Sequence, residues 1–243
     1  MNVFRCAAPS CAHPLPVGSA CARLAGVVPE VALMFLETEA CLAYGEEDLP
    51  PDLATLPLRY HVHLPLDVPW ERGVEAAGAA IEALVHKAAF VSPHALVLHP
   101  PSPDQLEGLL ERSPKLAASL VLENVPGADL AAVWPLIEAY NLGVCLDVGH
   151  LVTYGQHRIL DLPGFFSRVR LLHVYGGEPS GRHLPLGAFP DPELLRQMLC
   201  ATAACAAATP VSLVLEVFSW SHWEASMTTL SQWAQAWGLS WSS

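Results

Sequence analysis

The chain has 243 residues, of which 12 are Lys or Arg, 24 are Asp or Glu and 11 are His, so its formal net charge is −12. This length suits one large α/β domain, and a single (β/α)₈ barrel needs roughly 250 residues. The acidic balance argues against a nucleic acid or an anionic membrane as partner, because both require clustered Lys and Arg. Histidine is nearly as frequent as Lys and Arg together, and metal ligation is one explanation for that excess.

The cysteine pattern and the start of the chain predict neither a disulfide framework nor a secretory signal. The seven cysteines are odd in number and widely spread, and a chain of this length needs no disulfide to fold. Cys145, Cys200 and Cys205 lie in apolar or Ala-rich runs and are expected to be buried. No uninterrupted apolar segment of about 18 residues occurs, so we expect no membrane span and a cytoplasmic location.

Short apolar runs alternate with longer amphipathic or Ala-rich runs. The apolar runs are continuous, which is typical of strands covered on both faces. We predict strands at Asn2–Cys6, Val31–Leu36, Arg59–Leu64, Ala95–His99, Ser119–Glu123, Leu142–Asp147, Val169–Val174 and Val211–Glu216. We predict helices at Trp70–Ala89, Pro103–Arg112, Ala128–Tyr140, Asp191–Ala206 and Ser221–Gly238. Pro135 is expected to kink or break the third of these helices.

This alternation predicts the fold. Strands that alternate with helices favour a parallel sheet with right-handed crossovers, and eight such units close into a barrel. No linker or low-complexity tract interrupts the pattern, although the two units before Arg59 are short and broken by prolines. Residues 1–243 are therefore expected to form a single-domain (β/α)₈ TIM barrel of the α/β class.

Six successive strands, from the third onward, end in a residue that can bind a metal. These residues are His63, His99, Glu123, Asp147, His173 and Glu216. In a barrel of this kind the C-terminal strand ends meet at one rim, where active sites lie, and neighbouring strands are about 4.8 Å apart. The mixture of imidazole and carboxylate suits zinc, manganese or cobalt. We therefore predict divalent metal ions at this rim, two of them, with Glu123 placed to bridge both.

Further candidates lie in the loops after the sixth and seventh strands. His150 and His183 are expected to bind a further ion or the substrate, and Arg182 can clamp a phosphate or carboxylate. The alternatives are histidines that only form hydrogen bonds and a solvated Arg182. His61 is predicted to point to the opposite strand face from His63 and to be structural. The histidines without such a placement are expected to be structural or exposed: His13, His86, His94, His157 and His222.

The chain resembles the xylose-isomerase-like barrel superfamily and, within it, the endonuclease IV type of metal phosphodiesterase. The resemblance runs from about Arg59 to Glu216. It rests on the segments VHLPLD, LVLHPPS, LVLENVPG, GVCLDVGH, LLHVYGG, GRHLPLG and LVLE, which occur in that order. By this resemblance one metal takes His63, His99 and Glu123, and a second takes Glu123, Asp147, His173 and Glu216.

The same resemblance implies a third metal, held by two histidines and an aspartate. His150 and His183 match this set, but Gly181 stands at the aspartate position. This third site is therefore expected to be damaged, or rebuilt with Glu178 or a water. Sugar isomerases and epimerases of the superfamily keep the set of the second metal and usually lack the other histidines, so the histidines here favour phosphate ester chemistry.

A closer resemblance is to the cobamide-remodelling phosphodiesterases of bacteria, through the segment from His61 to Trp70. It implies hydrolysis of the nucleotide-loop phosphodiester of a cobamide, and a small-molecule substrate fits this short, acidic chain better than DNA does. Aromatic residues are then expected to line an apolar mouth for the corrinoid, or alternatively only to pack the rim. These residues are Trp70, Tyr154, Tyr175 and Trp220.

The predicted reaction is metal-assisted hydrolysis, in which the ions lower the pKa of a bridging water and neutralise charge on the phosphoryl group. Glu123 would bridge the ions, Glu216 would ligate and accept a proton, and Arg182 and His183 would hold the phosphate. One alternative is a single-metal sugar or keto-acid isomerase or epimerase, in which Glu123 and Glu216 shuttle a proton. Another is a non-catalytic binder of a metal or a corrinoid. The sequence predicts no oligomeric state.

Overall fold

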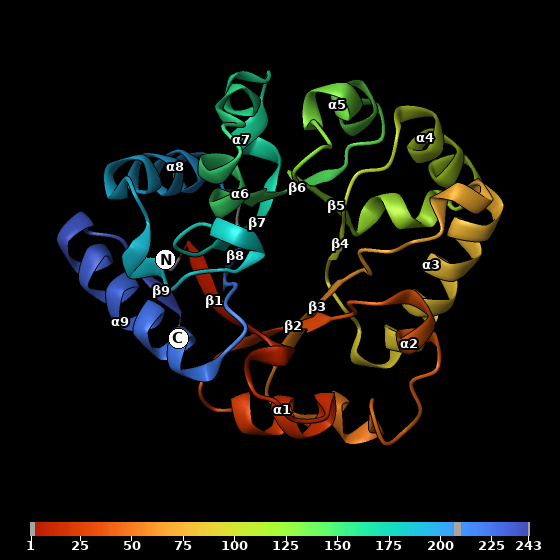
Figure 1. The fold of residues 1–243 in the computed structure, drawn as a ribbon, viewed down its shortest axis with the longest axis horizontal. Coiled ribbons are helices and arrows are strands. Elements are labelled where there is room, and N and C mark those ends of the chain that lie inside the picture. The colour runs from red at the N-terminus through yellow and green to blue at the C-terminus, as the bar shows by residue number, and fades with distance from the viewer. Residues whose placement is uncertain (1–2, 207–209, 243) are drawn as a thin grey trace.

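The computed structural model describes residues 3–206 and 210–242. Eight parallel strands follow one another around a closed barrel, in which the eighth pairs with the first. Their bounds are β1 (Phe4–Pro9), β2 (Glu30–Met34), β3 (Arg59–His63), β4 (Leu96–Leu98), β5 (Leu120–Glu123), β6 (Gly143–Asp147), β7 (Val169–Val174) and β8 (Val211–Leu215). A short β9 (Trp241–Ser242) pairs with the start of β1. Figure 1 shows the strands as an inner ring.

Helices form the outer ring (Figure 1). Their bounds are α1 (Val17–Leu24), α2 (Thr38–Leu42), α3 (Val74–Ala88), α4 (Pro103–Arg112), α5 (Leu130–Ala139), α6 (Val148–Thr153), α7 (Phe165–Arg168), α8 (Pro192–Cys205) and α9 (Trp220–Trp237). The predicted single-domain (β/α)₈ barrel is confirmed. Within the described ranges, no helix is both long and apolar enough to cross a membrane.

The strand boundaries differ from the prediction mainly near the N-terminus. The first strand runs from Phe4 to Pro9 rather than from Asn2 to Cys6, and Asn2 lies outside the described residues. The second strand ends at Met34, two residues before the predicted end at Leu36. Every other strand agrees with its prediction to within one residue at each end. Apolar runs therefore located the strands well, except where prolines and short loops surround them.

Two helix predictions need correction. The helix expected from Trp70 to Ala89 begins only at Val74, because Gly73 has a φ of 91° and separates it from a preceding 3₁₀ turn. α5 continues through Pro135 instead of breaking there. Pro135 is exposed, so the carbonyl that loses its hydrogen-bond donor is placed where water can reach it. All seven cysteines are free. Cys145 is buried as predicted, whereas Cys200 is half-buried and Cys205 is exposed, contrary to expectation.

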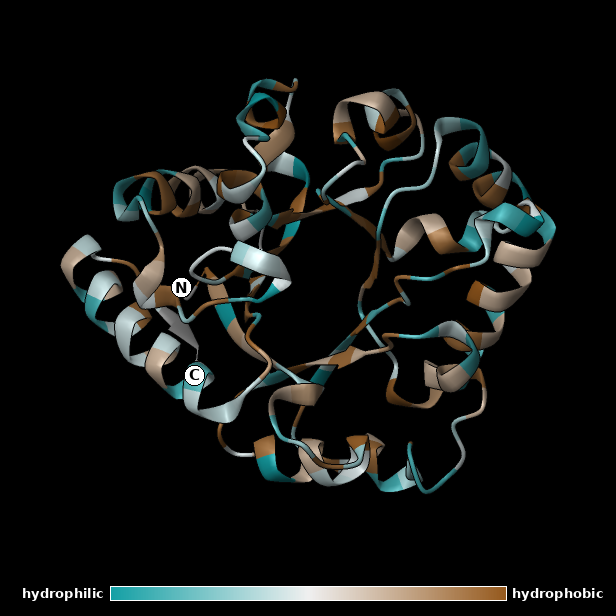
Figure 2. Ribbon diagram, viewed as in Figure 1, coloured by the Kyte–Doolittle hydropathy of each residue, from teal (hydrophilic) through white to brown (hydrophobic). Residues whose placement is uncertain are grey.

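Two apolar layers cover the barrel wall. The larger layer lies between strands and helices, and smaller clusters lie inside the barrel. The inner clusters consist of Ala95, Val97, Val121, Cys145 and Leu171, and of Ala7, Ala32, Met34 and Val214. Figure 2 shows mostly brown, hydrophobic strands and helices that alternate between brown and teal. Because both faces of the strands are packed, the strand ends that carry the side chains of the rim are held in fixed positions.

A buried polar cluster lies at the N-terminal end of the barrel, opposite the rim. The Glu30 carboxylate accepts hydrogen bonds from His61 Nδ1 at 2.8 Å and from His94 Nε2 at 3.0 Å. Arg5 lies 3.5 Å from its second oxygen. Burial alone would raise the pKa of Glu30, but the two histidines hold it well below its usual range. The cluster therefore keeps a charged carboxylate inside the barrel.

The prediction that His61 and His63 point to opposite faces is wrong. Residues two apart in a strand share a face, and His61 pairs with Ala32 while His63 pairs with Met34, both of which lie in one inner cluster. His61 thus lies inside the barrel one layer below His63. Its position at the base places it away from the rim, and its structural role stays a prediction.

We predict that Glu30→Gln lowers the free energy of unfolding at pH 7 by about 2–3 kcal/mol, because it removes a buried charge that Arg5 and two histidines surround. The depressed pKa makes this contribution present above the unfolded pKa of about 4.3 and smaller as the pH falls below it. Urea unfolding measures it, with the exposed Glu107→Gln as the control. A Glu30 variant as stable as the control would contradict this account.

Candidate metal centre

The strand ends bring six side chains to one rim. β3, β5 and β6 end in ligand-type residues, two more directly follow β4 and β8, and one is the penultimate residue of β7. In chain order they are His63, His99, Glu123, Asp147, His173 and Glu216. Five of them are at most 3% exposed, and His99 is half-buried. The arrangement therefore forms a compact polar cage at the C-terminal mouth of the barrel.

Glu123 lies at the centre of this cage, and its two oxygens face different partners. Oε2 lies 3.1 Å from His63 Nε2 and 3.4 Å from His99 Nε2. Oε1 lies 3.1 Å from His173 Nδ1 and 3.7 Å from His150 Nδ1. A carboxylate that offers one oxygen to each of two groups of imidazoles has the geometry of a bridging ligand.

Four of the residues form a second, overlapping group. One ligand atom from each of Glu123, Asp147, His173 and Glu216 lies within 4.8 Å of the others. His173 Nδ1 is 3.3 Å from Glu216 Oε2 and 3.9 Å from Asp147 Oδ2. One imidazole and three carboxylates at this spacing can surround a single divalent ion.

Among the described residues, no Lys or Arg offsets the negative charge of the cage. Glu123, Asp147 and Glu216 are buried, and histidines are their only ion-pair partners within residues 3–206 and 210–242. At the base of the barrel, by contrast, Glu30 has Arg5 beside it. Burying an uncompensated carboxylate costs several kcal/mol. The residues present therefore fit divalent cations, which would supply the missing positive charge.

The pKa values show how far histidines offset this charge. Burial would lower the pKa values of His63 and His173, but neighbouring anionic groups raise both. Burial raises the pKa of Asp147 well above its usual range, and the charges of Glu123 and Glu216 raise it further. Burial would raise the pKa of Glu123 as well, but His173 and the neighbouring imidazoles hold it well below its usual range. Burial would also raise the pKa of Glu216, but His173 lowers it to about 2. Without a cation, the cage accommodates two charged carboxylates more readily than three.

Three histidines are oriented in the same way. His63 Nδ1 lies 2.9 Å from the Leu64 carbonyl, His150 Nδ1 lies 3.0 Å from the Asn124 carbonyl, and His183 Nδ1 lies 2.6 Å from the Glu216 carbonyl. A ring whose Nδ1–H donates to a carbonyl can offer the lone pair of Nε2 to a metal ion. This is the usual arrangement of a metal-binding histidine.

A third group lies beside the cage, over β6 and β7. Ligand atoms of His150, Glu178 and His183 lie within 4.8 Å of one another, and His150 Nε2 is 3.2 Å from Glu178 Oε2. Tyr154 donates a 3.0 Å hydrogen bond to the same glutamate oxygen. Gly181, at the position of the expected aspartate, is exposed and has a φ of 69°. Glu178 therefore places a carboxylate beside His150 and His183.

Two residues that position the cage were not identified from the sequence. The Asn124 side chain pairs with the backbone of Asp147, accepting from its N–H and donating to its carbonyl, both at 2.8 Å. This fixes the end of β6 against the end of β5. Tyr175 donates to Asp147 Oδ2 at 3.2 Å, and its ring stacks on His183 with 3.7 Å between centroids. Gly149 makes room for this ring, since a Cβ there would lie 2.2 Å from it.

The remaining candidates have mixed placements. Arg182 is exposed, and no ion pair joins it to any part of the chain that the structure describes. Tyr175 is fully buried, so for this residue the mouth-lining prediction is wrong and the packing alternative is right. Trp220 is half-buried and stacks on His13, while Tyr154 is exposed. A cavity of about 590 Å³ over β1 and β2 is lined by Tyr44 and by none of the expected aromatic residues.

We predict that removing metal with a chelator lowers the melting temperature by about 5 °C or more, because ions bound only by the folded state stabilise it. Differential scanning calorimetry with elemental analysis measures the shift and the metal content. Glu123→Gln should bind at least one ion fewer per chain and shift less, whereas Glu107→Gln should behave as the unmodified protein. Purified protein that contains no metal and whose melting is unaffected by added zinc, manganese or cobalt would contradict the assignment.

No protein-family model matches this chain, and no curated protein gives a significant match to it. Solved structures resemble it closely in fold. A xylose isomerase domain protein from Planctomyces limnophilus is 15% identical, with 98% of each chain covered and a TM-score of 0.61. SacUVDE is 14% identical over 94% of this chain and 98% of its own, with a TM-score of 0.60. The 3-keto-D-glucoside 4-epimerase YcjR from E. coli is 12% identical, with 97% of this chain and 100% of its own chain covered and a TM-score of 0.65. The chain therefore has the TIM-barrel fold of xylose-isomerase-like proteins.

Proposed function

We propose that the protein is a metal-dependent phosphodiesterase that acts on a small molecule. The observation that carries the proposal is the position of Glu123. One of its oxygens faces His63 and His99, and the other faces His173 and the group of carboxylates. Such a bridged pair of metal sites is typical of enzymes that displace a leaving group from phosphorus, since two ions can stabilise both the attacking and the leaving oxygen.

The residues have distinct roles in this proposal. When bound, divalent ions supply an activated water and neutralise charge on the phosphoryl oxygens. Glu123 would hold the two sites at a fixed separation, and Glu216, which is ionised because its pKa is low, would ligate an ion. His183 is fixed by its bond to the Glu216 carbonyl. Exposed Arg182, one residue before it, is free to reach the phosphate.

The proposed substrate is small rather than polymeric. The chain carries a net charge of −12, so a polyanionic backbone would be repelled as it approached the rim. The sequence resemblance to cobamide-remodelling enzymes makes the nucleotide-loop phosphodiester of a cobamide the most specific candidate. Incubation of the metal-loaded protein with a cobamide, followed by mass spectrometry of the products, tests this candidate directly.

A second candidate function is a single-metal isomerase or epimerase. The group of Glu123, Asp147, His173 and Glu216 is complete without the other histidines, and one neighbour in fold is named as a 3-keto-D-glucoside 4-epimerase. The two candidates differ in metal content. One ion per chain, with activity insensitive to His63→Ala and His99→Ala, would favour the isomerase.

We predict that the protein hydrolyses bis(p-nitrophenyl) phosphate when zinc, manganese or cobalt is supplied, and that Glu123→Gln lowers kcat/KM at least about 1000-fold. That loss corresponds to about 4 kcal/mol of transition-state stabilisation. Release of p-nitrophenolate measures the rate, and Glu107→Gln is the matched control because this glutamate is exposed on α4, away from the rim. Absence of hydrolysis with all three metals would count against the phosphodiesterase.

We further predict that Glu178→Gln weakens zinc binding at the third group, formed with His150 and His183, at least about tenfold. The ions at the other two sites should stay in place, because the substitution removes only one of the three side chains of the third group. Zinc titration followed by calorimetry measures this affinity. Tyr154→Phe, which removes only the hydrogen bond to Glu178, should have a smaller effect. Unchanged zinc affinity in the Glu178 variant would mean that His150 and His183 serve the substrate instead.

A further inference from the structure

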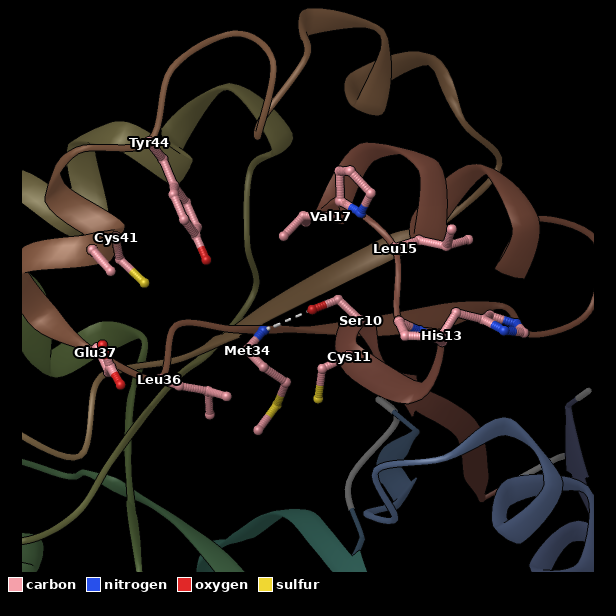
Figure 3. A pocket seen from close by; sticks show the side chains of 13 residues that line it. Ser10, Cys11, His13, Leu15, Val17, Met34, Leu36, Glu37, Cys41 and Tyr44 are labelled. Carbon is pink, nitrogen blue, oxygen red and sulfur yellow. Dashed lines mark hydrogen bonds between the residues drawn. The ribbon is translucent and has the colours of Figure 1, made fainter.

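A cavity of about 590 Å³ opens over the C-terminal ends of β1 and β2. Cys11 and Met34 lie low in it, and Figure 3 shows the Tyr44 hydroxyl pointing into the space above them. Its volume lies within the range of about 300–1,000 Å³ that is usual for small-molecule sites. The proposed function assigns no role to this cavity.

The cavity lies directly beside the metal centre. Cys11 packs against the inner cluster that contains Met34 and Val214. Met34 pairs in register with His63, and Val214 pairs with His173. Met34, which lines the lower part of the cavity, therefore lies one strand away from the candidate ligand His63.

The chemistry of the lining selects against an anion. Its side chains are mainly apolar, with Leu15, Val17 and Leu36 around the opening. Among the described lining residues there is no Lys or Arg, and Glu37 is the one carboxylate. A phosphate or carboxylate group would find no cation here, whereas an apolar group would be removed from water. The Tyr44 hydroxyl can also form one hydrogen bond, as donor or acceptor, with a polar atom at the edge of such a group.

Local contacts hold the walls in place. The Met34 backbone N–H donates to Ser10 Oγ at 3.1 Å, which joins the segment after β1 to β2 (Figure 3). Asp67 accepts from Thr38 N–H at 2.7 Å and from its hydroxyl at 3.0 Å, which anchors the start of α2. Pro14 and Pro16 restrict the backbone of the remaining wall. The site is thus formed before any ligand arrives, so binding requires little ordering.

We propose that this cavity is the specificity site of the enzyme and binds an uncharged, apolar, ring-sized group of the substrate while the ester phosphate lies at the metal centre. The assignment of the bound group to a phosphodiester rests on the proposed function. The cavity therefore selects the group that is esterified to the phosphate, and hydrolysis takes place at the metal centre on the rim.

The test uses 2-naphthol as an uncharged probe and measures its fluorescence on titration with the metal-loaded protein. Ala40 is exposed on α2 and lines the cavity, so Ala40→Trp fills it. Leu36→Asp, a second variant, places a charge there instead. Both should weaken binding at least tenfold, whereas Ala132→Trp, at an exposed position on α5, should bind as the unmodified protein does. Absence of saturable binding, or equal binding to all variants, would overturn the proposal.

Turnover separates this proposal from the proposed function. We expect kcat/KM for p-nitrophenyl 2-naphthyl phosphate to exceed that for p-nitrophenyl methyl phosphate, and Ala40→Trp to reduce this ratio at least tenfold. A ratio that Ala40→Trp leaves unchanged would overturn the specificity site even if both esters are hydrolysed. Naphthol binding that both variants weaken, with neither ester hydrolysed, would support the apolar site and contradict the phosphodiesterase.

Discussion

The burial of three carboxylates at one point of the rim is the constraint on which the rest of the site depends. Glu123, Asp147 and Glu216 come from strands β5 and β6 and from the residue after β8, and no Lys or Arg among the described residues pairs with them. Histidines offset part of this charge, and bound cations would offset the rest. Three of the surrounding histidines have Nδ1 next to a backbone carbonyl, which leaves Nε2 to bind such a cation.

Buried carboxylates have different partners at the two ends of the barrel. At the base, Arg5 supplies a positive charge beside Glu30, and two histidines donate hydrogen bonds to the carboxylate. Between the two ends lies an inner cluster of small and medium apolar side chains, which separates the base from the rim. The base therefore contributes to stability, whereas the buried carboxylates of the rim are available to bind cations.

Sequence reasoning predicted the barrel and the rim well because both follow from local patterns. Each candidate ligand ends a continuous apolar run, and parallel strands bring their C-terminal ends together. The base cluster was missed because His61 and His94 are 31 and 64 residues from Glu30, so only the strand register brings them together. The His61 error had a simpler cause, since alternation was applied to residues two apart. The cavity at Tyr44 depends on how the proline-containing segment after β1 packs against the segment after β2, which no periodicity encodes.

The fold alone does not select among the reactions, because barrels that share it at 12–15% identity include an epimerase. The geometry of Glu123 is more informative. A residue that moves a proton to and from a substrate carbon needs a carboxylate oxygen that reaches the substrate. Both oxygens of Glu123 already face imidazoles, and Glu216 Oε2 faces His173 and His183. Carboxylates engaged in this way are better suited to holding ions than to shuttling protons, which favours ester hydrolysis over epimerisation at this rim.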